Sequence, residues 1–123
     1  TWTEGNIYMP GGKFASKRFF LRRLRSGALL LIRNDAPSGG GRTHMTAFVS
    51  DDDGATWKGG LVLDDRESSY PDAIESSDGT LFVIYDHQRY TLNREGQPGV
   101  GADRRCALVQ CRRGAGAVLR QCA

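Results

Sequence analysis

The chain has 123 residues, of which 25% are charged and 39% apolar, a composition typical of globular proteins rather than of disordered ones. The net charge of +3 comes from the C-terminal end, because residues 1–100 carry 12 Lys and Arg against 13 Asp and Glu, whereas residues 101–123 carry five Arg and one Asp. A near-neutral body argues against a nucleic-acid-binding face, and no apolar run is long enough to span a membrane.

The three cysteines give no sign of a metal site. Cys106, Cys111 and Cys122 all fall after residue 100, without a Cys-x-x-Cys pair or a neighbouring histidine. The sequence therefore predicts neither a bound metal nor a cofactor. The chain begins without a methionine, so we expect a piece of a longer protein, and the lack of a signal peptide leaves its location open.

Turn-forming residues and two short apolar runs open the chain. Residues 1–16 are rich in glycine and predict an entry loop. Residues 17–25 and 28–33 predict the two strands of a β-hairpin that turns at Ser26-Gly27. An amphipathic helix over residues 18–25 is the alternative, but two adjacent phenylalanines and the immediate turn favour a strand.

Two further strands follow. Residues 38–41 predict a flexible connection rather than a phosphate-binding loop, because Arg42-Thr43 does not complete a Walker pattern. Residues 43–50 predict a third strand and residues 61–63 a fourth. Four successive antiparallel strands with short turns form one blade of a β-propeller, here residues 17–65.

Between the third and fourth strands lies Ser50-Asp51-Asp52-Asp53-Gly54-Ala55-Thr56-Trp57, with the pattern Ser-x-Asp-x-Gly-x-Thr-Trp. This spacing predicts a tight turn in which Asp52 accepts hydrogen bonds from backbone N–H groups and Gly54 adopts a positive φ. Trp57 is a large apolar side chain that can seal one sheet against its neighbour. The three adjacent aspartates also suggest a calcium site, but the turn accounts for them.

The pattern restarts after residue 65. Residues 69–75 and 80–86 predict two strands, so that residues 66–90 form the first half of a second blade. Residues 91–123 predict an irregular tail, whose Arg, Cys, Ala and Gly content suggests coding sequence read out of frame. A terminal amphipathic helix over residues 106–120 is the structural alternative.

These features resemble the sialidase-like glycoside hydrolases, six-bladed β-propellers that carry the BNR or Asp-box repeat. The matching stretches are residues 50–57, Ser69-Tyr70-Pro71-Asp72 and the apolar run 78–86, and the likeness spans roughly residues 5–90. The resemblance implies an all-β fold with one antiparallel four-stranded blade and part of a second.

The resemblance also implies an active site around the propeller axis, at the ends of the inner strands. Sialidases hold the substrate carboxylate with arginines and use a tyrosine nucleophile with an aspartate as acid and base. Residues near predicted strand ends are the candidates for these roles, and each has a structural alternative as a packing residue, a turn cap, a solvated cation or an ion pair. The catalytic candidates are Tyr70, Asp72 and Asp86, and the substrate-binding candidates are Arg18, Arg66 and Arg89.

The resemblance implies that the parent protein hydrolyses terminal sugars, with sialic acid among the candidates. Its partners are then a glycoside substrate and the remaining blades of the parent chain. We expect the chain to be inactive alone, because a ring of blades builds the pocket. A non-catalytic propeller that binds carbohydrate or protein is the alternative function, and a truncated product without a function is a third. A secreted or periplasmic bacterial location fits such a parent.

Overall fold

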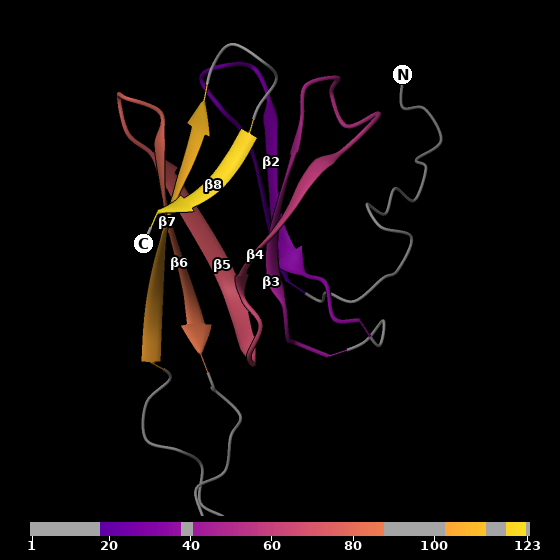
Figure 1. Cartoon of the computed structure of the whole chain (residues 1–123), viewed down its shortest axis with the longest axis vertical. Coiled ribbons are helices and arrows are strands. Elements are labelled where there is room, and N and C mark those ends of the chain that lie inside the picture. The colour runs from indigo at the N-terminus through magenta and orange to yellow at the C-terminus, as the bar shows by residue number, and fades with distance from the viewer. Residues whose placement is uncertain (1–17, 38–40, 88–102, 113–117, 123) are drawn as a thin grey trace, which may run out of the picture.

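The residues that the structure describes form two four-stranded antiparallel sheets, each with its strands in sequence order (Figure 1). The computed structural model describes residues 18–37, 41–87, 103–112 and 118–122, the last two ranges by the course of their backbone. The first sheet contains β1 (Phe19–Arg23), β2 (Leu29–Asn34), β3 (Met45–Ser50) and β4 (Lys58–Asp64); the second contains β5 (Ser68–Glu75), β6 (Thr80–His87), β7 (Asp103–Arg112) and β8 (Val118–Cys122).

The all-β fold and the four-stranded blade are confirmed. β1 and β2 form the predicted hairpin, so the alternative helix over residues 18–25 is wrong. The fourth strand begins at Lys58, three residues earlier than predicted, because β3 and β4 stay paired through two irregularities in their register. The described residues contain no helix with the length and apolar character needed to cross a lipid bilayer.

The tail differs from the expectation of an irregular segment. β7 pairs with the free edge of β6 from His87↔Asp103 to Thr80↔Gln110, and β8 pairs with β7 in turn. The terminal helix over residues 106–120 is therefore also wrong. Pairing with a distant strand edge determines this conformation, and the local composition carries no sign of that edge. The out-of-frame origin of the tail stays a prediction, which an independent read of the coding region tests.

The core lies between the two sheets and follows the alternation of side chains along each strand. In β2, Leu30 and Ile32 are 1% and 0% exposed, and in β6, Leu81 and Val83 are each 1% exposed. These side chains from both sheets belong to one apolar cluster, which also contains Met45, Ala47, Val49, Leu63, Ala73 and Tyr85. Each sheet thus buries one face against the other.

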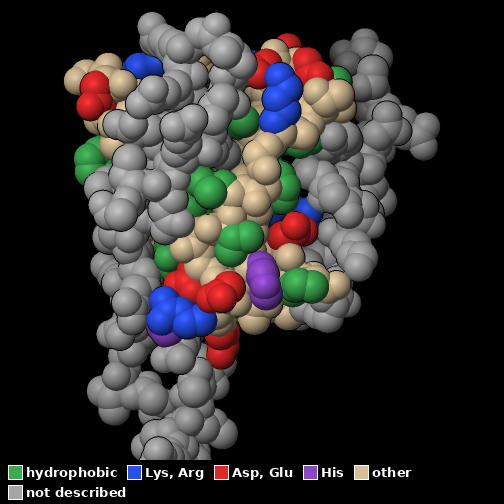
Figure 2. Space-filling view, in the orientation of Figure 1, with side chains coloured by type: hydrophobic (Ala, Val, Ile, Leu, Met, Phe, Trp, Pro, Cys, Tyr) green, Lys and Arg blue, Asp and Glu red, His purple; other side chains and the backbone are tan. Residues whose placement is uncertain are grey.

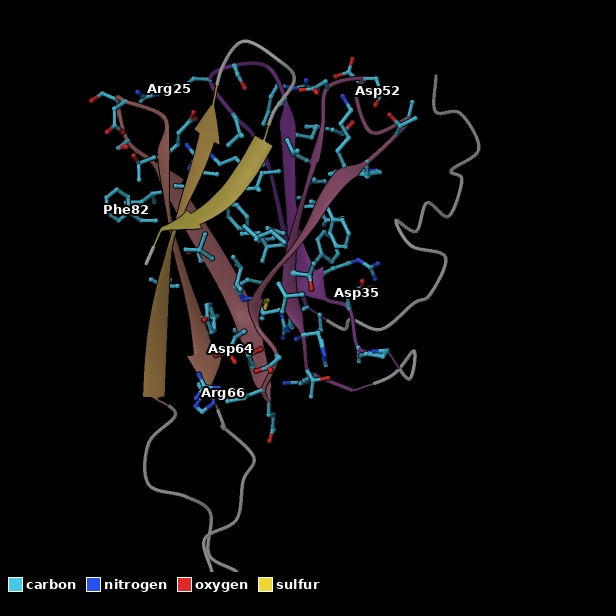
Figure 3. All side chains as sticks on the ribbon, in the orientation of Figure 1. Arg25, Asp35, Asp52, Asp64, Arg66 and Phe82 are labelled. Carbon is cyan, nitrogen blue, oxygen red and sulfur yellow. The ribbon has the colours of Figure 1, made fainter. Side chains whose placement is uncertain are left out.

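Each sheet also has an outer face, turned away from the core. The strand register places Phe19, Leu21 and Val62 on what we call the first outer face, which belongs to the first sheet. Register likewise places four residues on the second outer face: Asp72, Ile74, Phe82 and Ile84. In Figure 3, Phe82 points away from the first sheet.

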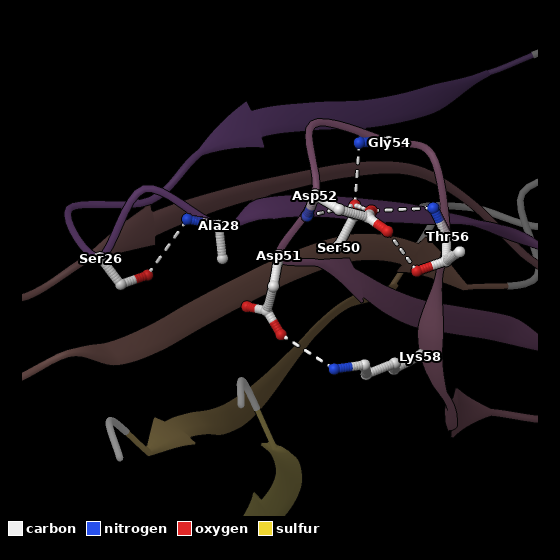
Figure 4. A network of polar contacts seen from close by, with 8 residues as sticks. All are labelled: Ser26, Ala28, Ser50, Asp51, Asp52, Gly54, Thr56 and Lys58. Atoms are coloured by element: carbon white, nitrogen blue, oxygen red, sulfur yellow. Dashed lines mark hydrogen bonds and ion pairs between the residues drawn. The ribbon is translucent and has the colours of Figure 1, made fainter. Parts of the chain in front are cut away.

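The turn between β3 and β4 has the predicted geometry (Figure 4). The Asp52 carboxylate accepts hydrogen bonds from the Thr56 N–H at 2.8 Å, from the Thr56 hydroxyl at 2.5 Å and from the Ser50 hydroxyl at 2.7 Å. Ser50 Oγ in turn accepts the Gly54 N–H at 2.8 Å, and Gly54 has the expected positive φ of 90°. Trp57 is half-buried, and its ring lies beside Gly54, which also lies next to the Leu29 side chain.

These hydrogen bonds favour the charged form of the aspartate. The bonds from the Thr56 side chain and backbone, followed by the bond from Ser50, lower the pKa of Asp52 to about 2. The turn between β5 and β6 repeats this arrangement in a shorter form, with Asp78 accepting from the Ser76 hydroxyl and from the Thr80 N–H. The pKa of Asp78 is likewise lowered to about 2, chiefly by the bond from Ser76.

The first prediction concerns the core between the sheets. Ile32→Ala removes a side chain that is 0% exposed and leaves a cavity. We expect the free energy of unfolding to fall by about 2–5 kcal/mol, measured by chemical denaturation. Arg22→Ala, at an exposed position of β1, is the control. A loss for Ile32→Ala as small as that of the control would contradict this packing.

The second prediction concerns the Asp52 turn. Because the pKa of Asp52 is lowered on folding, its contribution to stability is present above the unfolded value near 3.8 and is lost as the pH falls to about 2. We therefore expect Asp52→Asn to lower the melting temperature at pH 7, and the gap from the unsubstituted protein to narrow between about pH 4 and pH 2. Asp65→Asn, in the exposed connection between β4 and β5, is the matched control. A gap that does not change with pH would refute the role of the charge.

Candidate functional site

The antiparallel order brings several strand ends to the same end of the molecule. β1, β3 and β5 begin there, and β2, β4 and β6 end there, whereas the Asp52 turn lies at the opposite end. In Figure 3, Asp35, Asp64 and Arg66 lie toward this end, and Asp52 and Arg25 lie at the other. Figure 2 shows acidic, basic and histidine side chains near one another below the middle of the view. We call this end the strand-end face.

A tyrosine and two arginines meet on the strand-end face. The guanidinium carbon of Arg18, just before β1, lies 5.2 Å from the centroid of the Tyr70 ring. The guanidinium carbon of Arg42, just before β3, lies 5.6 Å from the same centroid. Both distances are in the range of cation–π attraction. We call Arg18, Arg42 and Tyr70 the Tyr70 cluster; it concentrates two positive charges around one phenol.

The backbone of Tyr70 is held in an unusual conformation. Its φ is +53°, in the left-handed region that costs a non-glycine residue about 1 kcal/mol or more. The register between β5 and β6 shifts here, from Ser69↔Asp86 to Asp72↔Ile84, which leaves one extra residue in β5. A bulge of this kind re-aims a side chain, and here it accompanies the contact of Tyr70 with both arginines.

Hydrogen bonds to two backbone carbonyls fix the loop that carries Arg42. The Ser68 N–H donates to the Arg42 carbonyl at 2.7 Å, and Asn34 Nδ2 donates to the Ser68 carbonyl at 2.9 Å. Asn34 and Ser68 are 2% and 1% exposed, so these bonds are shielded from water. The ends of β2 and β5 are thereby joined at Ser68, and Arg42 is held beside the start of β5.

A second group of titratable residues, which we call the Asp64 cluster, lies nearby at the end of β4. The Asp64 side chain is 3% exposed and accepts two bonds from the Arg66 guanidinium, each at 2.9 Å, and one from the Arg66 N–H at 3.0 Å. The Tyr85 hydroxyl lies 3.4 Å from its Oδ2. Burial by itself would raise the pKa of Asp64, but the hydrogen bonds and charge of Arg66 hold this pKa below its usual value.

His87 completes the Asp64 cluster. It is the last residue of β6 and is 3% exposed, and neither ring nitrogen has a hydrogen-bond partner within the part of the chain that the structure describes. Its ring lies close enough to Asp64 to act on that carboxyl electrostatically. Within the same described residues, no three His, Cys, Asp or Glu side chains are grouped closely enough to hold a metal ion.

The structure brings together some of the predicted site residues and separates others. Arg18 and Tyr70 are in contact, whereas Arg66 is paired with Asp64. Asp72 is exposed, and its carboxylate accepts the neighbouring Ala73 N–H at 2.8 Å, as a local cap does. Asp86 is half-buried. Because side chains alternate along a strand, Asp86 lies on the face of β6 opposite to that of Tyr85 and His87. Arg89 lies outside the described residues.

Arg42, Asp64 and Tyr85 were not among the sequence candidates. Arg42 follows a glycine-rich connection, and its position just before β3 places it at the same end as Arg18. Tyr85 continues the alternating buried positions of β6 after Leu81 and Val83, and this sequence pattern indicates that it is buried. Asp64 carries no signal of its own apart from its place at a strand end.

The fold and the strand-end face define the class of the protein: an all-β protein built from blade-like four-stranded sheets, in which Asp-containing turns join neighbouring strands. The sequence model of the family described as BNR repeat-like domain matches residues 16–83, more than half of the chain. The chain therefore belongs to the BNR repeat-like domain family. No curated protein and no solved structure matches the chain.

The third prediction concerns the ion pair of the Asp64 cluster. Arg66→Ala leaves a buried carboxylate without its cation, so we expect lower stability at pH 7 and a larger loss than for Arg22→Ala. Without Arg66, burial raises the pKa of Asp64, and the carboxyl then binds a proton more readily in the folded protein. The loss of stability should therefore begin to shrink above about pH 4, where the raised pKa lets the variant bind its proton, and should shrink further as the pH falls. Denaturant unfolding at a series of pH values measures this. A loss of unfolding free energy equal to that of Arg22→Ala would show that the Asp64–Arg66 pair does not stabilise the fold.

Proposed function

We propose that this chain is part of a sialidase-like β-propeller that binds a terminal sugar through its carboxylate and, in a complete ring of blades, hydrolyses the glycosidic bond. The convergence of Arg18 and Arg42 on Tyr70 is the observation that carries the proposal. Guanidinium groups bind carboxylates through paired, charge-assisted hydrogen bonds, and two of them beside one phenol suit an acidic sugar.

The position of the Tyr70 cluster supports this proposal. β1 and β5 are the first strands of their sheets, the place of inner strands in a propeller, and β5 contacts both β1 and β2. Arg18 precedes β1 and Tyr70 lies near the start of β5, so the cluster would face the axis of a six-bladed ring. The strained φ of Tyr70 is also typical of residues kept for function.

In this proposal Tyr70 is the nucleophile, and Asp72 and Asp86 are the carboxylates available to it. A tyrosine suits an acidic substrate because a carboxylate nucleophile would repel it. Asp72 is exposed and could exchange protons with solvent. The further blades that complete the ring supply the rest of the pocket.

A non-catalytic propeller that binds carbohydrate is the second candidate. The contacts of two carboxylates support this candidate: Asp64 is bonded to Arg66, and Asp72 accepts the Ala73 N–H. Both contacts are structural, so these carboxylates have a role that needs no catalysis. In this version the Tyr70 cluster binds an acidic sugar without cleaving it.

The fourth prediction tests binding. We expect the full chain to bind N-acetylneuraminic acid, followed by ligand-observed NMR, and not a neutral hexose. Arg18→Ala and Arg42→Ala should each weaken binding by roughly tenfold or more, the effect of losing a hydrogen bond to a charged group. Arg22→Ala, which removes an arginine from the opposite end of β1 and not from the cluster, should leave binding unchanged.

Hydrolysis of a fluorogenic sialoside separates the two candidates. Turnover in the assembled ring that is lost in Tyr70→Phe supports the hydrolase, and binding without turnover supports the second candidate. Equal binding of the acidic and neutral sugars would refute both versions of the site.

A further inference from the structure

The middle of the first outer face is buried, although its edges are open. Strand register places four residues of the central strands β2 and β3 on this face: Leu31, Arg33, Thr46 and Phe48. Each of the four is at most 9% exposed. The edge strands β1 and β4 contribute Phe19, Leu21 and Val62, which are 63%, 52% and 42% exposed. The burial is therefore confined to the two central strands.

The described residues account for only part of this burial. The second sheet packs on the opposite side of β2 and β3, so no described strand lies over the first outer face. Within the face, the guanidinium carbon of Arg33 lies 5.4 Å from the centroid of the Phe48 ring, and the Asp52 turn reaches the neighbouring Leu29 at Gly54. Arg33 itself is 6% exposed, so a further layer covers the guanidinium in turn.

The pattern of burial indicates a cover as wide as one extended chain. Neighbouring strands lie about 4.8 Å apart, and packed layers lie about 10 Å apart. A segment that runs lengthwise over β2 and β3 therefore buries both strands and leaves β1 and β4 open. A further sheet or a globular partner would also cover Phe19, Leu21 and Val62, which are exposed.

We propose that residues 1–17 form this cover, packed lengthwise over β2 and β3, and that their packing holds Arg18 against Tyr70. The segment joins β1 through Arg18, and β1 is the direct neighbour of β2. Its 17 residues can extend to roughly 56 Å, far more than the length of a six-residue strand such as β2. It contains five large apolar side chains that can pack on this face: Trp2, Ile7, Tyr8, Met9 and Phe14.

The other segments outside the described residues are less well placed. Residues 38–40 and 113–117 are short connections between neighbouring strands, at the ends of the sheets. Residues 88–102 join β6 to β7, which belong to the second sheet and are separated from this face by the core. Residues 1–17 adjoin the first sheet directly.

The consequence for the Tyr70 cluster follows from the position of Arg18. Arg18 stands between the segment and β1, and its guanidinium carbon lies 5.2 Å from the centroid of the Tyr70 ring. Arg42 lies over the same ring but is held from its own loop, where its carbonyl accepts the Ser68 N–H. Packing of residues 1–17 therefore sets the position of Arg18 and leaves that of Arg42 unchanged. The proposal concerns the geometry of the cluster and does not depend on the ligand that it binds.

NMR of the full chain at low concentration tests the cover. The Leu31 methyl groups should be protected from a soluble gadolinium chelate, whereas the Leu21 methyl groups, at the edge of the same face, should be broadened. The Leu31 methyl groups should also show NOEs to side-chain protons of residues 1–17.

A variant of the full chain tests the position of Arg18. Replacing Trp2, Ile7, Tyr8, Met9 and Phe14 together by serine should expose the Leu31 methyl groups to the chelate. The Arg18 side-chain protons should shift downfield, because they leave the shielding face of the Tyr70 ring. The Arg42 protons should keep their shift and are the internal control. The matched control variant, Thr3→Ser with Asn6→Ser and Lys13→Ser, should change neither measurement.

Several outcomes would overturn the proposal. NOEs from Leu31 to Tyr90 or Leu92 would assign the cover to residues 88–102, and protection that appears only at high concentration would assign it to a second copy of the chain. Leu31 methyl groups that stay protected in the folded fivefold variant would also refute the cover. Arg18 protons that keep their shift in that variant would refute the positioning of Arg18. If the variant loses cooperative melting, the NOEs of the unsubstituted chain decide the question.

Discussion

The contact between the two sheets is the constraint on which the rest of the structure depends. A β-sheet has two faces, and burying Leu30 and Ile32 against Leu81 and Val83 fixes which side chains of every paired strand point inward. The same contact sets the relative positions of β1 and β5, and with them the approach of Arg18 to Tyr70. Packing in the middle of the molecule therefore determines the geometry at its end.

The two ends of the sheets have different physical roles. At the turn end, Asp52 and Asp78 are exposed carboxylates that bind their own backbone, and their hydrogen bonds fix the connections between strands. At the strand-end face, Asp64 is buried, and its pair with Arg66 favours the charged form of its carboxyl. Charged groups also join segments that are distant in sequence at both ends, as Arg23 and Asp53 do at 2.7 Å at the turn end and as Arg42 and Tyr70 do at the strand-end face.

Short sequence patterns predicted the parts of the fold that depend on residues close together in the sequence. The Ser-Gly turn, the alternation in β6 and the spacing of Ser50, Asp52 and Thr56 each depend on a few neighbouring residues, and each has the expected structure. The pairing of β7 with β6 depends on an edge far away in the sequence, and composition alone led to the wrong expectation.

The candidate site was only partly predictable for the same reason. Position at a strand end selected Arg18 and Tyr70, which are in contact. The same rule selected Asp72 and missed Arg42, because a strand end tells which end of the sheet a residue occupies but not which way its side chain points. The direction of the Tyr70 side chain follows from a positive φ and a bulge, and no residue spacing in the sequence predicts either of them.

The bulge in β5 has a consequence for how this chain can vary in length. Between Ser69 and Asp72 the strand contains one residue more than its partner β6 requires. A chain shortened by one residue here would close the ladder with every other pairing and both faces unchanged. Tyr70 and Pro71 together stand opposite the single Tyr85, so strand pairing requires only one of them, and the contacts of Tyr70 with Arg18 and Arg42 lie outside that requirement.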